Sequence, residues 1–304
     1  MLEMKGVYTA TITPFDELGE INLSYVTRHL EFQEHHGVNG VIPCGTNGEG
    51  PSLSLAERKH LIEHVVWRKG NMHVIAAAGC VSLAETIELT KFAESAGADA
   101  ALLLPPFYFP NPAPEGLVSY FRWVLDSVSL PILLYNIPSF TGVEISDELL
   151  AGLQDYPHLY GVKDTSGSLD RLERYIRSFP RLKILCGSDD LAEAALKLGA
   201  AGSISGSSNV LPELMVEIHR KFFAGEDVSP ACRSRLQTAI SVQEKVARYK
   251  EIFKRYPFAG GNKYALSLRG FPPSLVRPPL VDLTEDQQSS LRSELDAEEF
   301  PFEV

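Results

Sequence analysis

The sequence contains little cysteine, and none of it is arranged as a metal or redox motif. Four of the 304 residues are cysteine, and no two of them form a C-x-x-C pair. A zinc ribbon and a thioredoxin-type site are therefore excluded. The spacing does not suggest a disulfide framework either, so we expect a reducing compartment, the cytoplasm. The cysteines are Cys44, Cys80, Cys186 and Cys232.

Positive charge is also scarce. The 28 lysines and arginines are outnumbered by 39 aspartates and glutamates, which gives a formal net charge of −11. So acidic a surface disfavours nucleic acid and anionic membranes as partners. No apolar run is long enough to span a membrane, and residues 1–15 lack the features of a signal peptide. We therefore expect small-molecule partners.

Three common catalytic signatures are missing, namely the Walker loop, the G-x-S-x-G elbow and the nucleotide-binding G-x-G-x-x-G. The metalloprotease pattern H-x-x-E-H does occur at His60–His64, but inside a helical segment, where a solvated helix face is the favoured interpretation. Asp189 and Asp190 have no further cation ligands at suitable spacing, and they are equally explained as helix caps. We expect no metal site.

The chain does contain a regular alternation of short apolar runs and longer amphipathic segments. The short runs are mostly continuous, which is typical of parallel strands buried on both faces. We predict strands at Val7–Thr13, Gly40–Pro43, Val74–Ala78, Ala100–Leu104, Ile132–Tyr135, Leu159–Lys163, Lys183–Cys186 and Gly202–Ser205.

The amphipathic segments carry helix start and stop signals. Ser54–Glu57 reads as a capping box, Ser82–Glu85 repeats the pattern, and Gly97 is placed to end the second helix. Eight strand–helix units in about 225 residues indicate a (β/α)8 TIM barrel. A doubly wound sheet is the alternative, but it usually shows a glycine fingerprint after the first strand, where Thr13–Asp16 stands instead.

We divide the chain into a catalytic barrel, residues 1–225, and a C-terminal helical extension packed on it, residues 226–304. Helical patterns such as Ala231–Phe253 fill the extension, and no linker separates it from the barrel. We expect the acidic end, Glu294–Val304, to be frayed.

One strand-like run ends abruptly in a lysine, Lys163, and Ser168 is placed to cap the helix that follows. Reacting groups of such barrels stand at the carboxyl ends of the strands. A lysine desolvated there is favoured as a neutral amine, which can attack a ketone and form a Schiff base. The competing interpretation is a lysine that extends from the strand end to water.

Other strand ends supply groups that fit this chemistry. The second leads into the glycine-rich stretch 44–50, whose amides suit a carboxylate or phosphate, although an ordinary turn explains it equally well. The fourth leads into the stiff aromatic loop 105–110, which is also explained by packing or an interface. The fifth ends at Tyr135, a candidate proton carrier, although buried tyrosines are more often structural. Their joint placement at one barrel end favours an active site.

At these residues the chain resembles the dihydrodipicolinate synthase / N-acetylneuraminate lyase family of class I aldolases. The resemblance covers nearly the whole chain, and its motifs are ITPF at 12–15, CGTNGE at 44–49, YNIPSFTG at 135–142 and GVKDTSG at 161–167. It implies a homotetramer (a dimer of dimers) of TIM barrels with C-terminal helices. It also implies a Schiff base between a lysine and pyruvate or another 2-keto acid, with no metal or organic cofactor.

The resemblance assigns roles by position. Lys163 matches the Schiff-base lysine, Tyr135 the proton-shuttling tyrosine and Thr46 the residue that relays the proton. Tyr108 matches a tyrosine that a neighbouring subunit lends to the site. The amides of Thr46 and Asn47 are implied to hold the pyruvyl carboxylate. The substrate-binding residues are thus Gly45, Thr46, Asn47, Phe140, Gly187 and Ile204.

Two departures from the synthase pattern bear on the substrate. Phe140 replaces an arginine that clasps the second substrate's carboxylate, and Asn47 replaces a second threonine. The runs at 50–54, 105–110, 161–165 and 277–280 look more like the 2-keto-3-deoxygluconate aldolase branch. We therefore predict an aldolase that cleaves a 2-keto-3-deoxy sugar acid into pyruvate and an aldehyde. The alternatives are dihydrodipicolinate synthase and, in another class, a non-catalytic keto-acid-binding regulator.

Overall fold

Eight parallel strands close into a barrel in the computed structural model, which describes residues 3–109, 111–225 and 233–302. Consecutive strands are paired all the way round, and the last closes onto the first. The predicted (β/α)8 TIM barrel is confirmed, because a doubly wound sheet would stay open. The strands are β1 (Gly6–Thr9), β2 (Gly40–Val41), β3 (His73–Ala77), β4 (Ala100–Leu103), β5 (Ile132–Asn136), β6 (Leu159–Asp164), β7 (Lys183–Cys186) and β8 (Gly202–Ser205).

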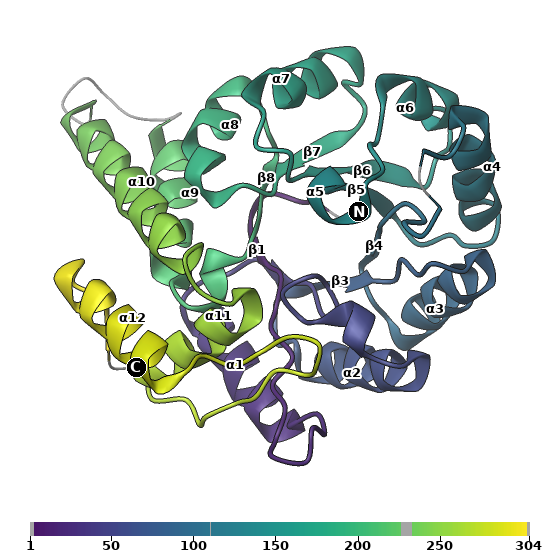
Figure 1. The fold of residues 1–304 in the computed structure, drawn as a ribbon. Helices are drawn as coiled ribbons and strands as arrows, with labels where there is room; N and C mark the ends of the chain where they lie inside the picture. The colour runs from purple at the N-terminus through teal and green to yellow at the C-terminus, as the bar shows by residue number, and fades with distance from the viewer. Residues whose placement is uncertain (1–2, 110, 226–232, 303–304) are drawn as a thin grey trace.

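Helices follow the strands and form the outer ring seen in Figure 1. Ser54 and Glu57 make the predicted capping box, whereas Ser82 only accepts the N–H of Glu85, without the reciprocal bond. Ser168 caps its helix as predicted. The ring comprises α1 (Leu23–His35), α2 (Leu55–Arg68), α3 (Leu83–Ala96), α4 (Pro114–Leu125), α6 (Asp147–Leu153), α7 (Leu169–Ser178), α8 (Ala192–Leu198) and α9 (Pro212–Gly225), whereas the short helix α5 (Pro138–Thr141) lies near the middle of the barrel, directly after β5 (Figure 1).

The C-terminal helices lie together on one side of the barrel (Figure 1). They are α10 (Arg233–Phe253), α11 (Phe258–Leu268) and α12 (Glu285–Ala297). A second apolar cluster, which includes Tyr25 and Phe32 of α1, Tyr249 of α10 and Leu291 of α12, holds them against the barrel. The predicted helix from residue 231 is described from residue 233, and the division at residue 225 stays a prediction.

The acidic end of the chain is not frayed, so that expectation was wrong for residues 294–302. Thr284 and Gln287 form a capping box at the start of α12, and the side chains of Leu295 and Phe300 are buried. The charged residues around them hide this apolar pattern in the sequence. Residues 303–304 of the expected frayed end lie outside the described part.

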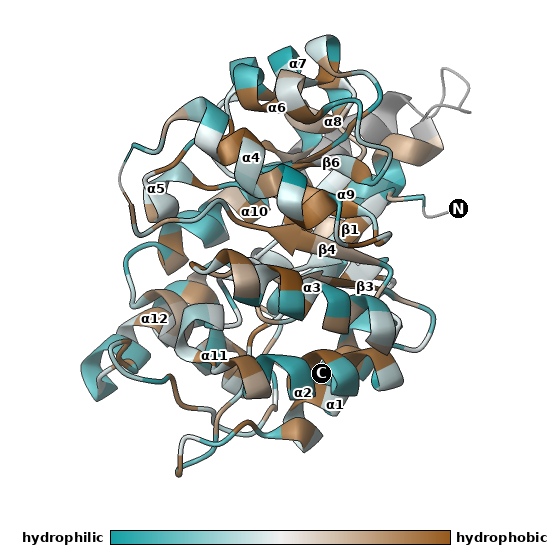
Figure 2. Cartoon of the chain, turned by 90° about the vertical axis from the view of Figure 1, so that its right-hand side faces the viewer, coloured by the Kyte–Doolittle hydropathy of each residue, from teal (hydrophilic) through white to brown (hydrophobic). Residues whose placement is uncertain are grey.

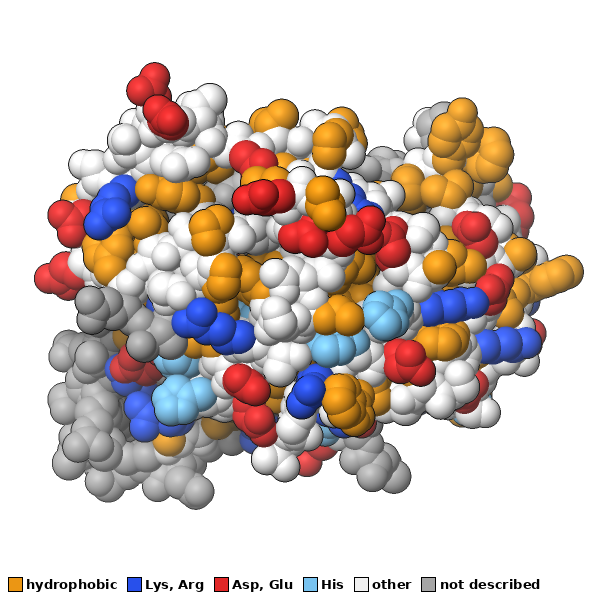
Figure 3. All heavy atoms as spheres, turned by 90° about the horizontal axis from the view of Figure 1, so that it is seen from below, with side chains coloured by type: hydrophobic (Ala, Val, Ile, Leu, Met, Phe, Trp, Pro, Cys, Tyr) orange, Lys and Arg blue, Asp and Glu red, His pale blue; other side chains and the backbone are white. Residues whose placement is uncertain are grey.

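Both faces of the strands carry buried apolar residues. Val41, Ile75, Leu133 and Val162, from four different strands, have no exposed surface. Figure 2 shows the strands in the hydrophobic colour and much of the outer helical surface in the hydrophilic one. On the face shown in Figure 3, acidic, basic and apolar side chains are interspersed. Within the described residues, no helix is both long enough and apolar enough to cross a membrane.

The pairing of β5 with β6 contains one irregular step near the start of the strands. Ile132 and Leu133 are consecutive on β5, but their partners on β6 are Leu159 and Gly161. Tyr160 is therefore an extra residue on β6, as in a β-bulge. Beyond this step the pairing is regular up to the last residues of both strands.

Candidate active site

The carboxyl ends of β5 and β6 place two of the predicted residues side by side. Tyr135 lies opposite Lys163, and the next pair is Asn136 and Asp164. Since side chains alternate across a strand, each pair shares one face. Asn136 donates to Asp164 over 2.5 Å and accepts the N–H of Ile145 in the segment before α6, so this pair faces outward. Tyr135 and Lys163 therefore face the barrel interior.

Lys163 is buried at this mouth, with 4% of its surface exposed. Its Nζ lies 4.0 Å from the centre of the Tyr135 ring. None of the ion pairs formed within residues 3–109, 111–225 and 233–302 includes this lysine. The amine thus lies over an aromatic ring and, within the described residues, is not held by a carboxylate, an arrangement that suits a lysine nucleophile.

Gly187, after β7, packs closely against the lysine. A Cβ at this position would lie 3.0 Å from Cε of Lys163 and 2.0 Å from Oγ1 of Thr165. Only glycine fits between them. Thr165 was missed from the sequence, although it lies within the lysine motif. Its Oγ1 is buried and has no hydrogen-bond partner in the described part of the chain.

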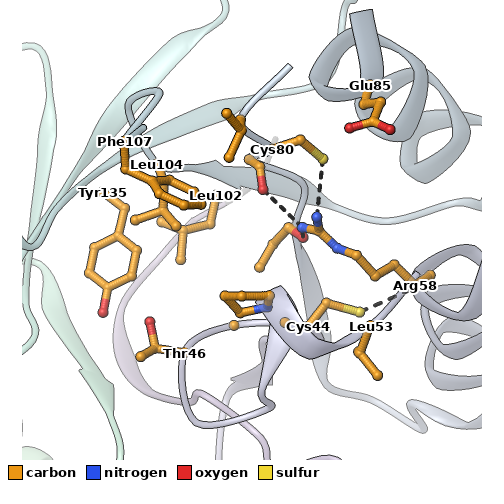
Figure 4. Close-up of a pocket in the computed structure, with 16 residues that line it drawn as sticks. Cys44, Thr46, Leu53, Arg58, Cys80, Glu85, Leu102, Leu104, Phe107 and Tyr135 are labelled. Carbon is orange, nitrogen blue, oxygen red and sulfur yellow. Dashed lines mark hydrogen bonds between the residues drawn. The ribbon is translucent and has the colours of Figure 1, made fainter. Parts of the chain in front are cut away.

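The glycine-rich loop after β2, residues 44–50, faces Tyr135 (Figure 4). Figure 4 shows the hydroxyls of Thr46 and Tyr135 pointing toward one another. Asn47 reaches the end of β8, where a Cβ on Gly206 would lie 2.9 Å from its Nδ2. Ile204 of β8 is buried, with 1% of its surface exposed. The structure therefore gathers most of the predicted site residues at one mouth.

A cavity of about 340 Å³ adjoins this mouth (Figure 4). Gly45, Thr46, Tyr135 and Phe107 are among its lining residues, whereas Lys163 is not. Its volume is in the range of small-molecule sites. Tyr135 thus belongs both to the wall of the cavity and to the surroundings of the lysine, and Thr46 belongs to the wall of the cavity.

Three comparisons with known proteins agree with this geometry. Residues 3–298 match the model of the dihydrodipicolinate synthetase family. The chain belongs to this family. The prediction of a carbon–carbon lyase is thereby confirmed.

Individual relatives span nearly the full length of the chain. A 4-hydroxy-tetrahydrodipicolinate synthase of Methanopyrus kandleri is 39% identical, over 96% of this chain and 96% of its own. A DapA-like lyase of Chloroflexus aurantiacus is 34% identical, with the same coverage. Among solved structures, YagE, a prophage protein of this family from E. coli K12 in complex with pyruvate, has a TM-score of 0.92. It is 27% identical, and the match covers 99% of this chain and 100% of YagE.

Two of the predicted site residues are largely exposed in this member of the family. The side chain of Tyr108 is 75% exposed, and its ring contacts that of Phe109. Phe140 of α5 is 63% exposed, and its ring centre lies 5.9 Å from that of Phe258. The loan of Tyr108 to a neighbouring subunit stays a prediction.

Arg58 of α2 lines the cavity and was missed from the sequence. Its guanidinium donates to the carbonyl oxygens of Ala77 and Gly79 and to Sγ of Cys80, while its buried Nε has no partner in the described residues. The signal was present, because Arg58 precedes Leu61 by three positions and so lies on the buried stripe of the helix.

The other candidate motifs have ordinary contacts. His64 of the H-x-x-E-H pattern pairs with Oγ1 of Thr27 at 2.9 Å. Asp189 accepts the N–H of Ser207 at 2.8 Å, and Asp190 forms an ion pair with Lys250. Within the described ranges, no three His, Cys, Asp or Glu side chains are grouped to hold a metal ion.

Proposed function

We propose that this lyase is a Schiff-base (class I) aldolase that makes or cleaves a C–C bond between pyruvate and an aldehyde, with a 2-keto-3-deoxy sugar acid as its substrate. The observation that carries the proposal is the buried Lys163, whose Nζ lies 4.0 Å from the Tyr135 ring. A lysine amine and a neighbouring tyrosine that can act as an acid–base group are the two groups that this chemistry requires.

The reaction begins with covalent attachment of the substrate. The amine of Lys163 attacks the C2 carbonyl carbon of the keto acid, and the resulting carbinolamine loses water to give an iminium. The iminium withdraws electrons from the neighbouring C–C bond. A covalent electron sink on the protein therefore takes the place of a metal or organic cofactor.

Bond cleavage then needs a base at the C4 hydroxyl. Tyr135, as its phenolate, takes that proton, the C3–C4 electron pair moves into the iminium, and the aldehyde leaves. The pyruvate enamine that remains is protonated at C3, and water hydrolyses the iminium to release pyruvate and free Lys163. Thr46, whose hydroxyl faces that of Tyr135 (Figure 4), relays the proton.

The glycine-rich loop binds the other end of the keto acid. In the proposed complex, backbone N–H groups of Thr46 and Asn47 hold the carboxylate next to C2, since such amide groups are favourable anion sites. Gly45, Gly187 and Ile204 line the space around it. Oγ1 of Thr165, which is buried and has no hydrogen-bond partner within the described residues, would bind a substrate hydroxyl in the proposed complex.

The choice of a sugar acid rests on Phe140. An apolar ring cannot make the paired charge-assisted hydrogen bonds that arginine makes with a carboxylate. An aldehyde that carries a carboxylate, such as aspartate semialdehyde, therefore loses its anchor at this position, whereas a neutral polyol aldehyde does not need one.

A second candidate, 4-hydroxy-tetrahydrodipicolinate synthase, is supported by the relative of that name from Methanopyrus kandleri. It uses the same Schiff base with pyruvate but condenses it with aspartate semialdehyde. The two candidates differ only in the second substrate, so the shared lysine chemistry does not separate them.

The deciding experiment has two steps. Borohydride reduction with pyruvate should add the pyruvate-derived mass to the peptide that contains Lys163, and its absence would sink the proposal. A panel of 2-keto-3-deoxy acids and aldehydes is then assayed for release or uptake of pyruvate. Turnover of aspartate semialdehyde alone would establish the second candidate. If the enzyme instead turns over a 2-keto-3-deoxy acid, F140R should raise its turnover of aspartate semialdehyde, because the new arginine can pair with the carboxylate of that aldehyde.

We also propose that the chain assembles as a homotetramer, a dimer of dimers, in the cytoplasm. The exposed aromatic side chains of Tyr108 and Phe109 support an interface at the loop after β4. Light scattering on a size-exclusion column measures the mass directly, and a monomeric mass would contradict this proposal.

A further inference from the structure

A buried ion pair connects the C-terminal helices to the loop that the proposed function assigns to the substrate carboxylate. Lys263 of α11 donates from Nζ to Oε1 of Glu49 over 2.5 Å. The two side chains have 1% and 0% of their surface exposed. Glu49 is in the glycine-rich loop 44–50, three residues beyond Thr46.

Both oxygens of the Glu49 carboxylate are held from the C-terminal side. Oε2 accepts the N–H of Arg277 over 3.0 Å, and Lys263 also donates to the carbonyl oxygen of Leu275 over 2.5 Å. The cationic groups of Lys263 and Arg277 each lie 4.4 Å from the centre of the Phe15 ring. The carboxylate is therefore fully desolvated and fixed by several contacts, so removal of one partner leaves a buried charge uncompensated.

The backbone at Glu49 connects this anchor to the binding loop. Its N–H donates to the carbonyl oxygen of Thr46 over 3.1 Å, which closes a turn around Asn47. Its φ is 53°, in the left-handed region that a residue with a side chain adopts only at a cost. Such a conformation persists where surrounding contacts impose it, and the anchored carboxylate is one of these contacts.

We infer that Glu49 and Lys263 are positioning residues for substrate binding: the pair holds the amides of Thr46 and Asn47 in the geometry that receives the pyruvate carboxylate. This inference rests on the proposed function. It makes the C-terminal helices part of the binding machinery, although they supply no group that touches the reacting atoms.

A second ion pair provides a matched control. Arg269, near the end of α11, donates to Glu213 of α9 over 2.7 Å, and its side chain is 4% exposed. It also fastens α11 to the barrel, but none of its hydrogen bonds within the described residues reaches the loop 44–50. R269M should therefore weaken the attachment of α11 without moving that loop.

The test measures pyruvate attachment in the full-length protein. Wild type, E49Q, K263M, E49Q/K263M and R269M are treated with borohydride over a series of pyruvate concentrations, and the adduct is quantified by intact mass. In K263M and E49Q the half-saturating pyruvate concentration should rise by about tenfold to a hundredfold, because a small misplacement of binding groups has effects of this size. The plateau should stay near that of wild type, since Lys163 is untouched.

The double variant and hydrogen exchange complete the test. E49Q/K263M, which leaves no uncompensated charge, should recover part of the affinity. Amides of residues 44–50 should exchange faster in E49Q than in R269M. If K263M does not fold, E49Q and its exchange pattern decide the question.

The outcomes separate the two proposals. No adduct in wild type overturns the proposed function and this inference with it. An adduct in wild type, with the same half-saturating concentration in E49Q and K263M as in R269M, overturns only the positioning role. Equal exchange of residues 44–50 in E49Q and R269M overturns it as well.

Discussion

The protein buries two lysines that have opposite surroundings. Lys263 has 1% of its side chain exposed, an ion pair with Glu49 and a hydrogen bond to a backbone carbonyl. Lys163 is also buried, yet no carboxylate within the described residues pairs with it, and its Nζ faces the ring of Tyr135. Burial lowers the pKa of Lys263, and the Glu49 carboxylate opposes this by stabilising the ammonium.

The difference indicates what each lysine is for. A buried charge with a full set of partners stabilises one arrangement of the chain and is unavailable to a substrate. A buried amine without an ionic partner contributes little to stability, so its retention at the end of β6 points to chemistry. Four changes break or sharpen this comparison, from the largest expected effect to the smallest.

K163M should reduce aldol cleavage by about 10⁴-fold or more, because the covalent route is lost. The borohydride adduct should disappear as well. Unfolding in urea should show a stability within about 1 kcal/mol of wild type, since no ion pair is broken. A large loss of stability would mean that this lysine, too, is structural.

Y135F should lower turnover by about 10²–10⁴-fold, the usual contribution of a general acid–base group. The pyruvate adduct should still form at saturation, because the lysine remains. Stopped-flow and intact-mass measurements on the same sample separate the two effects. Unchanged turnover would remove Tyr135 from the mechanism.

K263M should lower the stability of the fold but spare the pyruvate adduct, which is the opposite of what K163M should do. It leaves the Glu49 carboxylate buried without its cation, which should cost about 3–5 kcal/mol in the free energy of unfolding. The adduct at saturating pyruvate should persist. E49Q/K263M should be more stable than K263M, since the second substitution removes the uncompensated charge of the Glu49 carboxylate. Equal stability of the single and double variants would show that the pair is not coupled.

Two buried histidines, His29 and His219, test the effect of burial on a base that is neither a candidate catalytic group nor part of the Glu49 ion pair. Burial lowers the pKa of His29 and of His219 to about 4, from an ordinary value of 6.5. Between these values the unfolded chain binds protons that the folded chain does not. Stability should therefore fall as the pH drops from 6.5 to 4, by about 1.4 kcal/mol per pH unit for each histidine.

Denaturant titrations at a series of pH values measure this slope. H29Q should remove about half of it, because the glutamine does not titrate. A matched substitution of the exposed His60, H60N, should leave the slope unchanged. A slope that H29Q does not alter would assign the acid sensitivity to other groups.

The barrel could be predicted because most of the strands are short, largely apolar runs, and this pattern can be read without knowledge of any partner. Lys163 and Tyr135 could be found for the same reason, since both end such runs. The burial of Leu295 and Phe300 near the C-terminus was missed because Leu295 stands between two acidic residues and Phe300 follows two glutamates. Alternation with charge looks the same in a packed helix and in a frayed end.

Glu49 and Lys263 could not be recognised as buried from the sequence. A charged side chain is normally exposed, and its burial depends on a partner that is distant along the chain. Glu49 and Lys263 are 214 positions apart. Tyr108 poses a different problem, because its predicted role involves a second subunit.

The extra residue at Tyr160 has a consequence for engineering. On a regular strand counted from Leu159, Val162 would lie opposite Tyr135, and Lys163 would point away from the barrel interior. The irregular step shifts the pairing by one residue, so that Lys163 faces the barrel interior at the carboxyl end of β6. The chain length can therefore change at the start of β6 while the residues at its carboxyl end keep their orientation. Removal of residue 160 should yield a continuous ladder that still delivers its amine inward.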